Sequence, residues 1–325
     1  MLVVTNLAEL TDRHVGAIQA VDPRIELKRE GERDAAAYAR RLEQAEVFFG
    51  MRVAPDLPQR APKLRWLAST LAGVDALAGT GLLEQPFAVT TMKGIHRVSM
   101  GEHIMSVMLM WVRGMPRFLQ AQREGRWLPP AERPRLGELW GSTLGVVGLG
   151  NIGDEVARRA KAFDMRVLAT RRHVGPKDAG SKPAYVDRLL PASELDSLLS
   201  DSDFVLLALP LTGETRGILG ERELGLMKPS GVLINISRGA VLDEPALIEA
   251  LRTGRIGGAA LDVFATEPLA AGSPLWDLPN VILTPHISGQ SVRYWDRIVE
   301  LFCENLRRYL AGEELINRYD PNRGY

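Results

Sequence analysis

The segment 143–153 reads TLGVVGLGNIG and constrains the fold more than any other part of the chain. Its first residues have the apolar pattern of a buried strand, and an amphipathic helical pattern follows the last glycine. Between the two stand three glycines in the spacing G-x-G-x-x-G, namely Gly148, Gly150 and Gly153. A strand, this glycine turn and a helix, in that order, are typical of the unit that binds dinucleotides. The segment therefore predicts a dinucleotide site.

Each glycine has its own physical reason in such a unit. Gly148 permits the tight turn, Gly150 lets the backbone approach a pyrophosphate, and Gly153 lets the helix pack close to the strand. At Asn151 and Ile152 the helix N-terminus presents free backbone N–H groups and the positive end of the helix dipole to the phosphates.

Short apolar runs alternate with helical patterns along the whole chain. Strands are expected at 2–5, 45–49, 64–69, 88–91, 143–147, 165–169, 204–209, 232–236, 258–263 and 281–283, with helices such as 34–45, 101–113, 152–163, 192–199 and 244–253 between them. Nearly continuous apolar strands such as VLLALP and VLINIS are typical of parallel sheets covered on both faces. The chain is therefore predicted to be an α/β protein.

Length and composition exclude several classes of protein. The 325 residues suggest about two domains. A net charge of +0 argues against a nucleic-acid or anionic-membrane surface as partner. The single cysteine, Cys303, excludes an intrachain disulfide and a cysteine-based zinc site, and we expect no metal site. Because the N-terminus lacks the pattern of a secretory signal and no apolar stretch is long enough to span a bilayer, we expect a cytoplasmic location.

The strand after the glycine turn indicates which dinucleotide binds. In NAD-binding units this strand ends in an acidic residue that accepts hydrogen bonds from the ribose hydroxyls. Here the strand ends in Thr170, Arg171 and Arg172. Arginine forks bind a 2′-phosphate, which a carboxylate would repel. We therefore expect NADP(H) as the preferred cofactor, with NAD(H) as the alternative.

Polar side chains that could take part in catalysis stand at the ends of three later strands. They are Arg238 after 232–236, Asp262 in 258–263 with Glu267 shortly after it, and His286 after 281–283. Because ligands of open α/β sheets bind at the carboxyl ends of the strands, we expect these side chains to converge. Of the other histidines, His14 stands in a polar context and is expected to be solvated.

With these motifs in place, the chain resembles the D-isomer-specific 2-hydroxyacid dehydrogenases, a family that includes glyoxylate and hydroxypyruvate reductases. The resemblance covers essentially the whole chain. It is carried by GLGNIG (148–153), LPLTGETRGIL (209–219), MKPSGVLINISRGAVLDEPALIEAL (227–251), LDVFATEPL (261–269) and TPHISG (284–289). It implies reversible, NAD(P)H-dependent reduction of a 2-keto acid to the D-2-hydroxy acid.

The resemblance also implies roles for individual residues. Arg238 would hold the substrate carboxylate and polarise the keto oxygen, and His286 would act as the acid/base. Glu267 would pair with His286 and stabilise its protonated form, while Asp262 looks like the ligand of the nicotinamide carboxamide. Further cofactor-binding residues implied by the motifs, besides Arg238 and His286, are Leu209, Pro210, Thr215, Ile236, Ser237, Ser288 and Gly289.

On the substrate side, residues 64–77 resemble the family's strand and loop that hold the substrate carboxylate. The backbone at Leu71, Ala72 and Gly73 would lie near that group, and Gly73 permits a close approach. A second substrate loop would place Met51 and Arg52 near the substrate's R group.

The family topology implies a Rossmann-type cofactor domain, residues 98–286, inserted into a flavodoxin-like substrate domain, residues 1–97 and 287–325, each a doubly wound parallel sheet. We expect a homodimer that forms through the cofactor domain, with helix 101–113 and the proline-rich arm 126–141 as contacts.

Two other interpretations stay open: a short phosphoglycerate dehydrogenase-like enzyme, and a nucleotide-sensing protein like the transcriptional corepressors of the same fold. The set Arg238, Glu267 and His286 disfavours the sensor. Formate dehydrogenases carry glutamine where Glu267 stands, which disfavours that branch.

Overall fold

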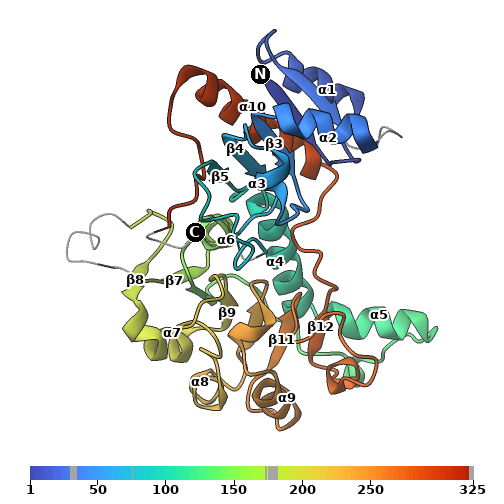
Figure 1. Ribbon diagram of the computed structural model, residues 1–325. Coiled ribbons are helices and arrows are strands. Elements are labelled where there is room, and N and C mark those ends of the chain that lie inside the picture. The colour runs from blue at the N-terminus through green and yellow to red at the C-terminus, as the bar shows by residue number, and fades with distance from the viewer. Residues whose placement is uncertain (30–34, 75, 173, 175–181, 322–325) are drawn as a thin grey trace. The chain divides into compact units, whose positions relative to one another are not determined.

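The structure is a computed structural model and describes residues 1–29, 35–74, 76–172, 174 and 182–321. The chain divides into two compact units (Figure 1). One comprises Met1–Ile95 and Ser291–Tyr325, and the other comprises His96–Gln290. The assignment of substrate binding to the first unit and cofactor binding to the second stays a prediction.

The first unit is built on a five-stranded parallel sheet in the order β2-β1-β3-β4-β5, which is the flavodoxin-like order. Its strands and helices are β1 (Leu2–Thr5), α1 (Asp12–Gln19), β2 (Glu26–Arg29), α2 (Ala35–Gln44), β3 (Val47–Gly50), α3 (Leu57–Arg60), β4 (Trp66–Ser69), β5 (Ala88–Thr90) and α10 (Tyr294–Ala311). Phe302 of α10 stacks on Phe49 of β3 with ring centroids 3.9 Å apart. This buried contact fixes the C-terminal helix in the unit that the N-terminal strands form.

The second unit is built on a seven-stranded parallel sheet in the order β12-β11-β10-β9-β6-β7-β8. Counted from β6, this is the Rossmann order 3-2-1-4-5-6 with one more strand beside the last. Its elements are α4 (Arg97–Val112), α5 (Met115–Arg123), β6 (Thr143–Val147), α6 (Asn151–Lys161), β7 (Arg166–Arg171), β8 (Arg188–Pro191), α7 (Leu195–Asp201), β9 (Phe204–Leu207), α8 (Glu221–Leu226), β10 (Val232–Asn235), α9 (Glu244–Arg252), β11 (Gly258–Leu261) and β12 (Val281–Leu283).

Helices cover both faces of this sheet. Side chains of α4 and α6 pack on one face, and those of α7, α8 and α9 pack on the other. Every residue of β6, β9, β10 and β11 is buried, which explains why these strands are apolar apart from Thr143 and Asn235. The prediction of two doubly wound parallel-sheet domains is confirmed.

Two strands of the structure were not expected from the sequence. β2 and β8 each lie at an edge of their sheet and are partly exposed. An edge strand needs only one paired neighbour and tolerates polar side chains, so the runs ELKR and RLLP lack the apolar signature of the central strands. Among the helices of the described residues, none has the length and apolar character needed to cross a membrane.

Candidate active site

The carboxyl ends of the seven-stranded sheet bring the candidate residues of the second unit into one row. Neighbouring strands pair in parallel, so the segments that follow them leave the same edge. Passing from β12 to β7, these segments contain His286, Asp262, Arg238, Pro210, Gly148 and Arg172 in that order. We call the segments after β10, β11 and β12 the catalytic end, and those after β6, β7 and β9 the nucleotide end.

At the nucleotide end, the turn after β6 needs glycine. Gly148 has a φ of 101°, and a Cβ added to it would lie 2.8 Å from the carbonyl oxygen of Ala208. The neighbouring strand holds this turn. The hydroxyl of Thr170 accepts a hydrogen bond from Gly148 N at 3.3 Å, and its carbonyl accepts one from Leu149 N at 2.8 Å. Thr170, predicted to bind the cofactor, is buried and supports the turn.

The two glycines after Gly148 stand in different surroundings. A Cβ on Gly153 would lie 2.5 Å from the Gly148 carbonyl oxygen, so α6 packs tightly on the turn. A Cβ on Gly150, in contrast, would meet nothing within 4 Å, so the backbone there faces open space. The first turn of α6, which begins at Asn151, has no side-chain cap among the described residues. Its backbone N–H groups, including that of Ile152, are therefore suited to an anion.

Two arginines stand at the end of the neighbouring strand. Arg171 is the last residue of β7, Arg172 follows it, and both are exposed. Arg172 Nη2 donates to Oε2 of Glu214 at 2.7 Å. Glu214 lies in the segment after β9 and was not predicted as a site residue.

The segment after β9 is tied into a compact turn by its own threonines. Thr215 Oγ1 donates to the carbonyl oxygen of Pro210 at 2.6 Å and accepts from Thr212 N at 2.8 Å. Leu209 is half-buried and Pro210 is exposed. The hydroxyl of Thr215, predicted to line the ribose pocket, is thus used within the turn.

At the catalytic end, a buried asparagine shapes the turn that carries Arg238. Asn235, the last residue of β10, accepts hydrogen bonds at Oδ1 from the backbone N and the Oγ of Ser237, at 3.1 and 2.8 Å. Its Nδ2 donates to the Arg238 carbonyl oxygen at 3.2 Å. Ile236 and Ser237 are buried, whereas Arg238 is exposed. Arg238 Nη1 donates to the Ser237 carbonyl oxygen at 2.8 Å, so the guanidinium is held at this turn.

Asp262 organises the segment after β12. Its carboxylate is only 1% exposed. It accepts hydrogen bonds from Thr284 Oγ1 at 2.6 Å, Ile287 N at 3.0 Å and Ser288 N at 2.9 Å. Burial raises the pKa of Asp262, but the hydrogen bonds from Ser288, Thr284 and Ile287 outweigh it and hold the pKa below the ordinary value. Asp262 therefore fixes the backbone on the C-terminal side of His286.

Helix α4 supports the same segment. His103 Nε2 lies 3.4 Å from Thr284 Oγ1, and burial lowers the pKa of His103. Further along, the carbonyl oxygen of Gly289 accepts from Ser99 Oγ at 3.0 Å and lies 3.1 Å from His96 Nδ1.

His286 and Glu267 form a direct pair. His286 Nδ1 lies 2.7 Å from Glu267 Oε2, and Glu267 Oε1 accepts from Phe264 N at 3.0 Å. Because a carboxylate only accepts hydrogen bonds, Nδ1 carries the proton, which leaves Nε2 for chemistry. The imidazole side chain is 49% exposed. A Cβ on Gly239 would lie 1.9 Å from the Phe264 carbonyl carbon, so the Arg238 turn lies directly against the segment that holds Glu267.

The predicted substrate residues belong to the first unit. Asn6 Oδ1 accepts from Met51 N at 3.3 Å, and Asn6 Nδ2 donates to the Arg52 carbonyl oxygen at 2.6 Å. The Arg52 side chain is exposed. Leu71, Ala72 and Gly73 follow β4, the strand that pairs with β3, so within this unit both loops leave one sheet edge. Their role in substrate binding stays a prediction.

The sequence analysis missed Asn235, Thr284 and Glu214, and it was wrong about one histidine. A polar residue inside an apolar strand was an available signal for Asn235. No comparable signal marked Glu214. His14, expected to be solvated, is buried, and its Nε2 lies 2.8 Å from Asp296 Oδ1. That partner is 282 residues away in the chain, beyond the reach of a local pattern.

Comparisons with known proteins agree on one family. The family profile described as the NAD binding domain of D-isomer specific 2-hydroxyacid dehydrogenases matches residues 105–288. The chain is 37% identical over 275 residues to a glyoxylate reductase of Pyrococcus furiosus, covering 82% of this chain and 79% of that protein.

Solved structures give the same result. A D-isomer specific 2-hydroxyacid dehydrogenase of Xanthobacter autotrophicus Py2, in complex with NADPH and MES, superposes with a TM-score of 0.81 at 30% identity and full coverage of both chains, 100% and 100%. An NADPH-dependent glyoxylate/hydroxypyruvate reductase of Sinorhizobium meliloti, in complex with NADP and sulfate, has a TM-score of 0.82 at 27% identity, with coverage of 100% and 99%.

Proposed function

The chain belongs to the D-isomer specific 2-hydroxyacid dehydrogenase family, and from this premise we propose that it is an NADPH-preferring reductase of glyoxylate and hydroxypyruvate. As a member of this family it is an NAD(P)-dependent oxidoreductase that acts on 2-keto acids. The observation that carries the proposal is the His286–Glu267 pair beside the Arg238 turn, on the sheet edge that also holds an open glycine turn.

The mechanism assigns a task to each residue of the catalytic end. A bound nicotinamide cofactor supplies the hydride. Arg238 holds the substrate carboxylate with its planar fork and polarises the keto oxygen. His286 donates the Nε2 proton to that oxygen, while its Nδ1–H stays bonded to Glu267. In the reverse direction Nε2 accepts the hydroxyl proton.

Glu267 and Asp262 do different work around His286. The Glu267 carboxylate accepts from Nδ1 and stabilises the positive charge of the protonated imidazole. Asp262 keeps the backbone after His286 in place through Ile287 and Ser288. The proposed contact of Asp262 with the nicotinamide carboxamide would add to that task.

Preference for NADPH is supported by charge at the nucleotide end. Arg171 and Arg172 are exposed at the strand end where NAD-binding units carry an acidic residue. The relatives from X. autotrophicus and S. meliloti were solved with NADPH and NADP. Backbone N–H groups at Asn151 and Ile152 would hold the pyrophosphate.

The names of the relatives support the substrate class. The P. furiosus protein is a glyoxylate reductase, and the S. meliloti protein reduces glyoxylate and hydroxypyruvate. We expect Arg52 to favour a polar R group, so Arg52→Ala should lower kcat/KM for hydroxypyruvate more than for glyoxylate. An equal loss with both substrates would remove Arg52 from the substrate site.

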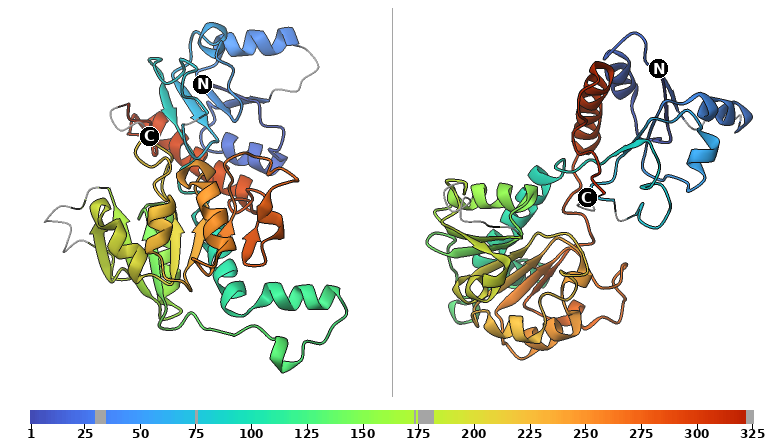
Figure 2. Two further views of the ribbon diagram at one scale, coloured as in Figure 1. Left: turned by 90° about the horizontal axis from the view of Figure 1, so that it is seen from below. Right: turned by 60° about the vertical axis from the view of Figure 1, so that its left-hand side comes forward.

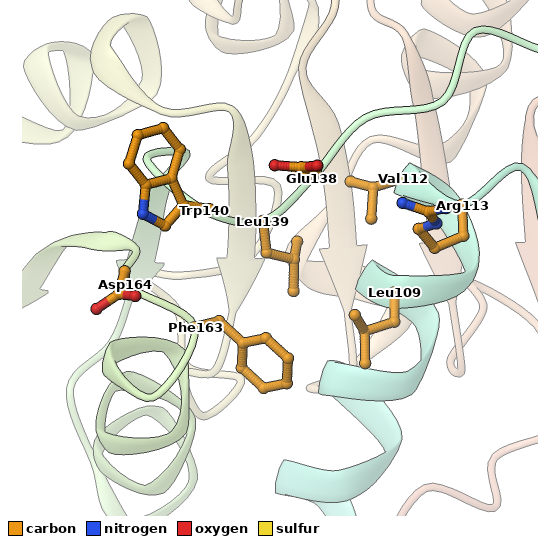
Figure 3. Close-up of a pocket in the computed structure, with 8 residues that line it drawn as sticks. All are labelled: Leu109, Val112, Arg113, Glu138, Leu139, Trp140, Phe163 and Asp164. Carbon is orange, nitrogen blue, oxygen red and sulfur yellow. The ribbon is translucent and has the colours of Figure 1, made fainter.

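A homodimer through the second unit is supported by exposed apolar side chains on its arm. Trp127 is 89% exposed, and helix α5, which precedes it, extends away from the sheet (Figure 2). In the same unit, Leu109, Trp140 and Phe163 line a surface pocket of about 330 Å³ (Figure 3). Apolar surface of this kind is typical of an interface, and we propose a second copy of this chain as its partner. Light scattering on the wild type and on Trp127→Glu tests this, with a dimer and a monomer as the expected masses.

One experiment tests the proposed function as a whole. Initial rates of NADPH oxidation are measured with glyoxylate, hydroxypyruvate, 2-ketoisocaproate and 3-phosphohydroxypyruvate, and the product of hydroxypyruvate is analysed for chirality. We expect the highest kcat/KM with glyoxylate or hydroxypyruvate, and D-glycerate as the product. The highest value with 3-phosphohydroxypyruvate would indicate a phosphoglycerate dehydrogenase, and binding of NADPH without turnover of any keto acid would indicate a sensor.

A further inference from the structure

An ion pair spans the nucleotide end of the sheet. Arg172 follows β7, Glu214 lies in the turn after β9, and their side chains meet at 2.7 Å. β6 lies between β7 and β9 in the sheet. The pair therefore connects the two segments that flank the glycine turn after β6.

The position of Glu214 is set by its turn. Thr212 and Thr215 exchange hydrogen bonds, with Thr215 N donating to Thr212 Oγ1 at 3.3 Å and Thr212 N donating to Thr215 Oγ1 at 2.8 Å. Thr215 Oγ1 also closes the turn onto Pro210. Glu214 sits inside this fixed turn and points its carboxylate to the end of β7. The acidic group that is missing from the end of β7 is thus supplied by the turn after β9.

A carboxylate at this place affects two cofactors differently. The 2′-phosphate of NADP(H) is an anion that needs the guanidinium of Arg172, and Glu214 both occupies that guanidinium and repels the phosphate. The 2′-hydroxyl of NAD(H) carries no charge, and a carboxylate accepts its hydrogen bond.

We propose that Glu214 is a specificity-determining residue of the cofactor site, which pairs with Arg172 in the free protein and reduces the preference for NADP(H) over NAD(H). This inference rests on the proposed function, because it requires Arg172 to bind the 2′-phosphate. Glu214 thus lowers the preference for NADP(H), whereas Arg171 and Arg172 raise it.

The expected size of the effect follows from exposure. Arg172 and Glu214 side chains are 57% and 70% exposed, so their attraction is that of a solvated surface pair. Such a pair changes an equilibrium by up to about fivefold, and salt screens it over roughly 10 Å at 0.1 M ionic strength.

Calorimetric titration of NADP⁺ and of NAD⁺ into the whole protein, at low and at high salt, provides the test. In Glu214→Gln, the ratio of the Kd for NAD⁺ to the Kd for NADP⁺ should rise about threefold at low salt, and less at high salt. In the Arg172→Ala background the same substitution should change that ratio by a smaller factor, because the competition for the guanidinium is gone and only the direct effects of the carboxylate on the 2′-group remain.

Glu249→Gln is the matched control. Glu249 forms another exposed pair in the second unit, with Arg252 at 3.5 Å and side-chain exposures of 64% and 59%. Its substitution removes the same charge and breaks the same kind of pair on α9. We expect the Kd ratio to equal that of the wild type, which would show that net charge alone does not explain the effect.

The outcomes separate this inference from the function on which it rests. If Arg172→Ala weakens NADP⁺ binding while Glu214→Gln leaves the Kd ratio unchanged, the role of Glu214 is overturned and the NADPH preference stands. If the effect of Glu214→Gln is equally large without Arg172, competition for Arg172 is overturned. If Arg172→Ala leaves NADP⁺ binding unchanged, the role of Arg172 in the proposed preference fails together with this inference.

Discussion

At the catalytic end of the seven-stranded sheet, the Asp262 carboxylate is buried and accepts three hydrogen bonds from the segment that carries His286. At the nucleotide end of the same edge, Arg172 and Glu214 form one contact that is open to solvent. Both places carry charged side chains where parallel strands end. Asp262 is surrounded by hydrogen-bond donors, whereas Arg172 and Glu214 are surrounded mostly by solvent.

The difference follows from the work of each end. Proton transfer requires Nε2 of His286 at a defined position, and small displacements are costly, so the backbone after His286 is held by the buried Asp262. Choosing between two cofactors requires only a difference in binding free energy, which exposed charges provide. Substitutions at the catalytic end should therefore lower turnover with both cofactors alike, and those at the nucleotide end should change the ratio between cofactors.

The largest effect is expected from His286→Ala. Removing the proton donor should lower kcat about 1000-fold with either cofactor, because positioned acid–base groups contribute on the order of 10²–10⁴ to rate. NADPH should still bind, which fluorescence titration measures. Turnover close to that of the wild type would contradict the assignment of His286.

Glu267→Gln should lower kcat about 100-fold. Glutamine keeps a hydrogen-bond acceptor near His286 Nδ1 but removes the charge that stabilises the protonated ring. Steady-state kinetics with hydroxypyruvate measure this loss. Turnover close to that of the wild type would contradict the role of Glu267.

Asp262→Asn should reduce the free energy of unfolding by about 2 kcal/mol at neutral pH, since an amide nitrogen would face buried donors. The pKa of Asp262 is lowered in the folded state, so its ionised form stabilises the protein above the ordinary value of 3.8, and this contribution is lost as the pH falls through the lowered pKa. Urea unfolding at several pH values should therefore show a smaller loss of stability in acid for the variant. If the free energy of unfolding fell equally with pH in the wild type and the variant, Asp262 would not contribute in this way.

The double substitution Arg171→Ala with Arg172→Ala should lower kcat/KM for NADPH about 20-fold and that for NADH less than about twofold, because hydrogen bonds to a charged phosphate are lost. Arg166→Ala is the matched control, since Arg166 begins the same strand at its opposite end. The control should keep the wild-type ratio. Glu214→Gln, with its shift of about threefold in the other direction, is the smallest effect in this series.

Strands with apolar sequences could be predicted well, and edge strands with polar sequences could not. The apolar runs 143–147 and 281–283 match β6 and β12, whereas the polar edge strands β2 and β8 carry no such pattern. The sequence placed His286 and Glu267 near one another through the family motifs, and the structure joins them at 2.7 Å.

The supporting residues could not be predicted in the same way. Thr284 binds Asp262 between the segments that follow two neighbouring strands, β12 and β11. Glu214 meets Arg172 between the segments after β9 and β7, which have β6 between them. Such contacts depend on strand order and on loop shape, which a linear pattern does not contain. The sequence shows that no acidic residue stands at the end of β7. It does not show that Glu214, in the turn after β9, reaches the same place.

The central claim is that the catalytic end sets turnover and the nucleotide end sets the choice of cofactor. Its most direct test is the ratio of kcat/KM with NADPH to kcat/KM with NADH, measured with hydroxypyruvate for the wild type and for Glu267→Gln. We expect a ratio of about 10 or more in the wild type, and the same ratio in the variant despite its lower turnover. A ratio at or below unity in the wild type, or a ratio that collapses in Glu267→Gln, would contradict it.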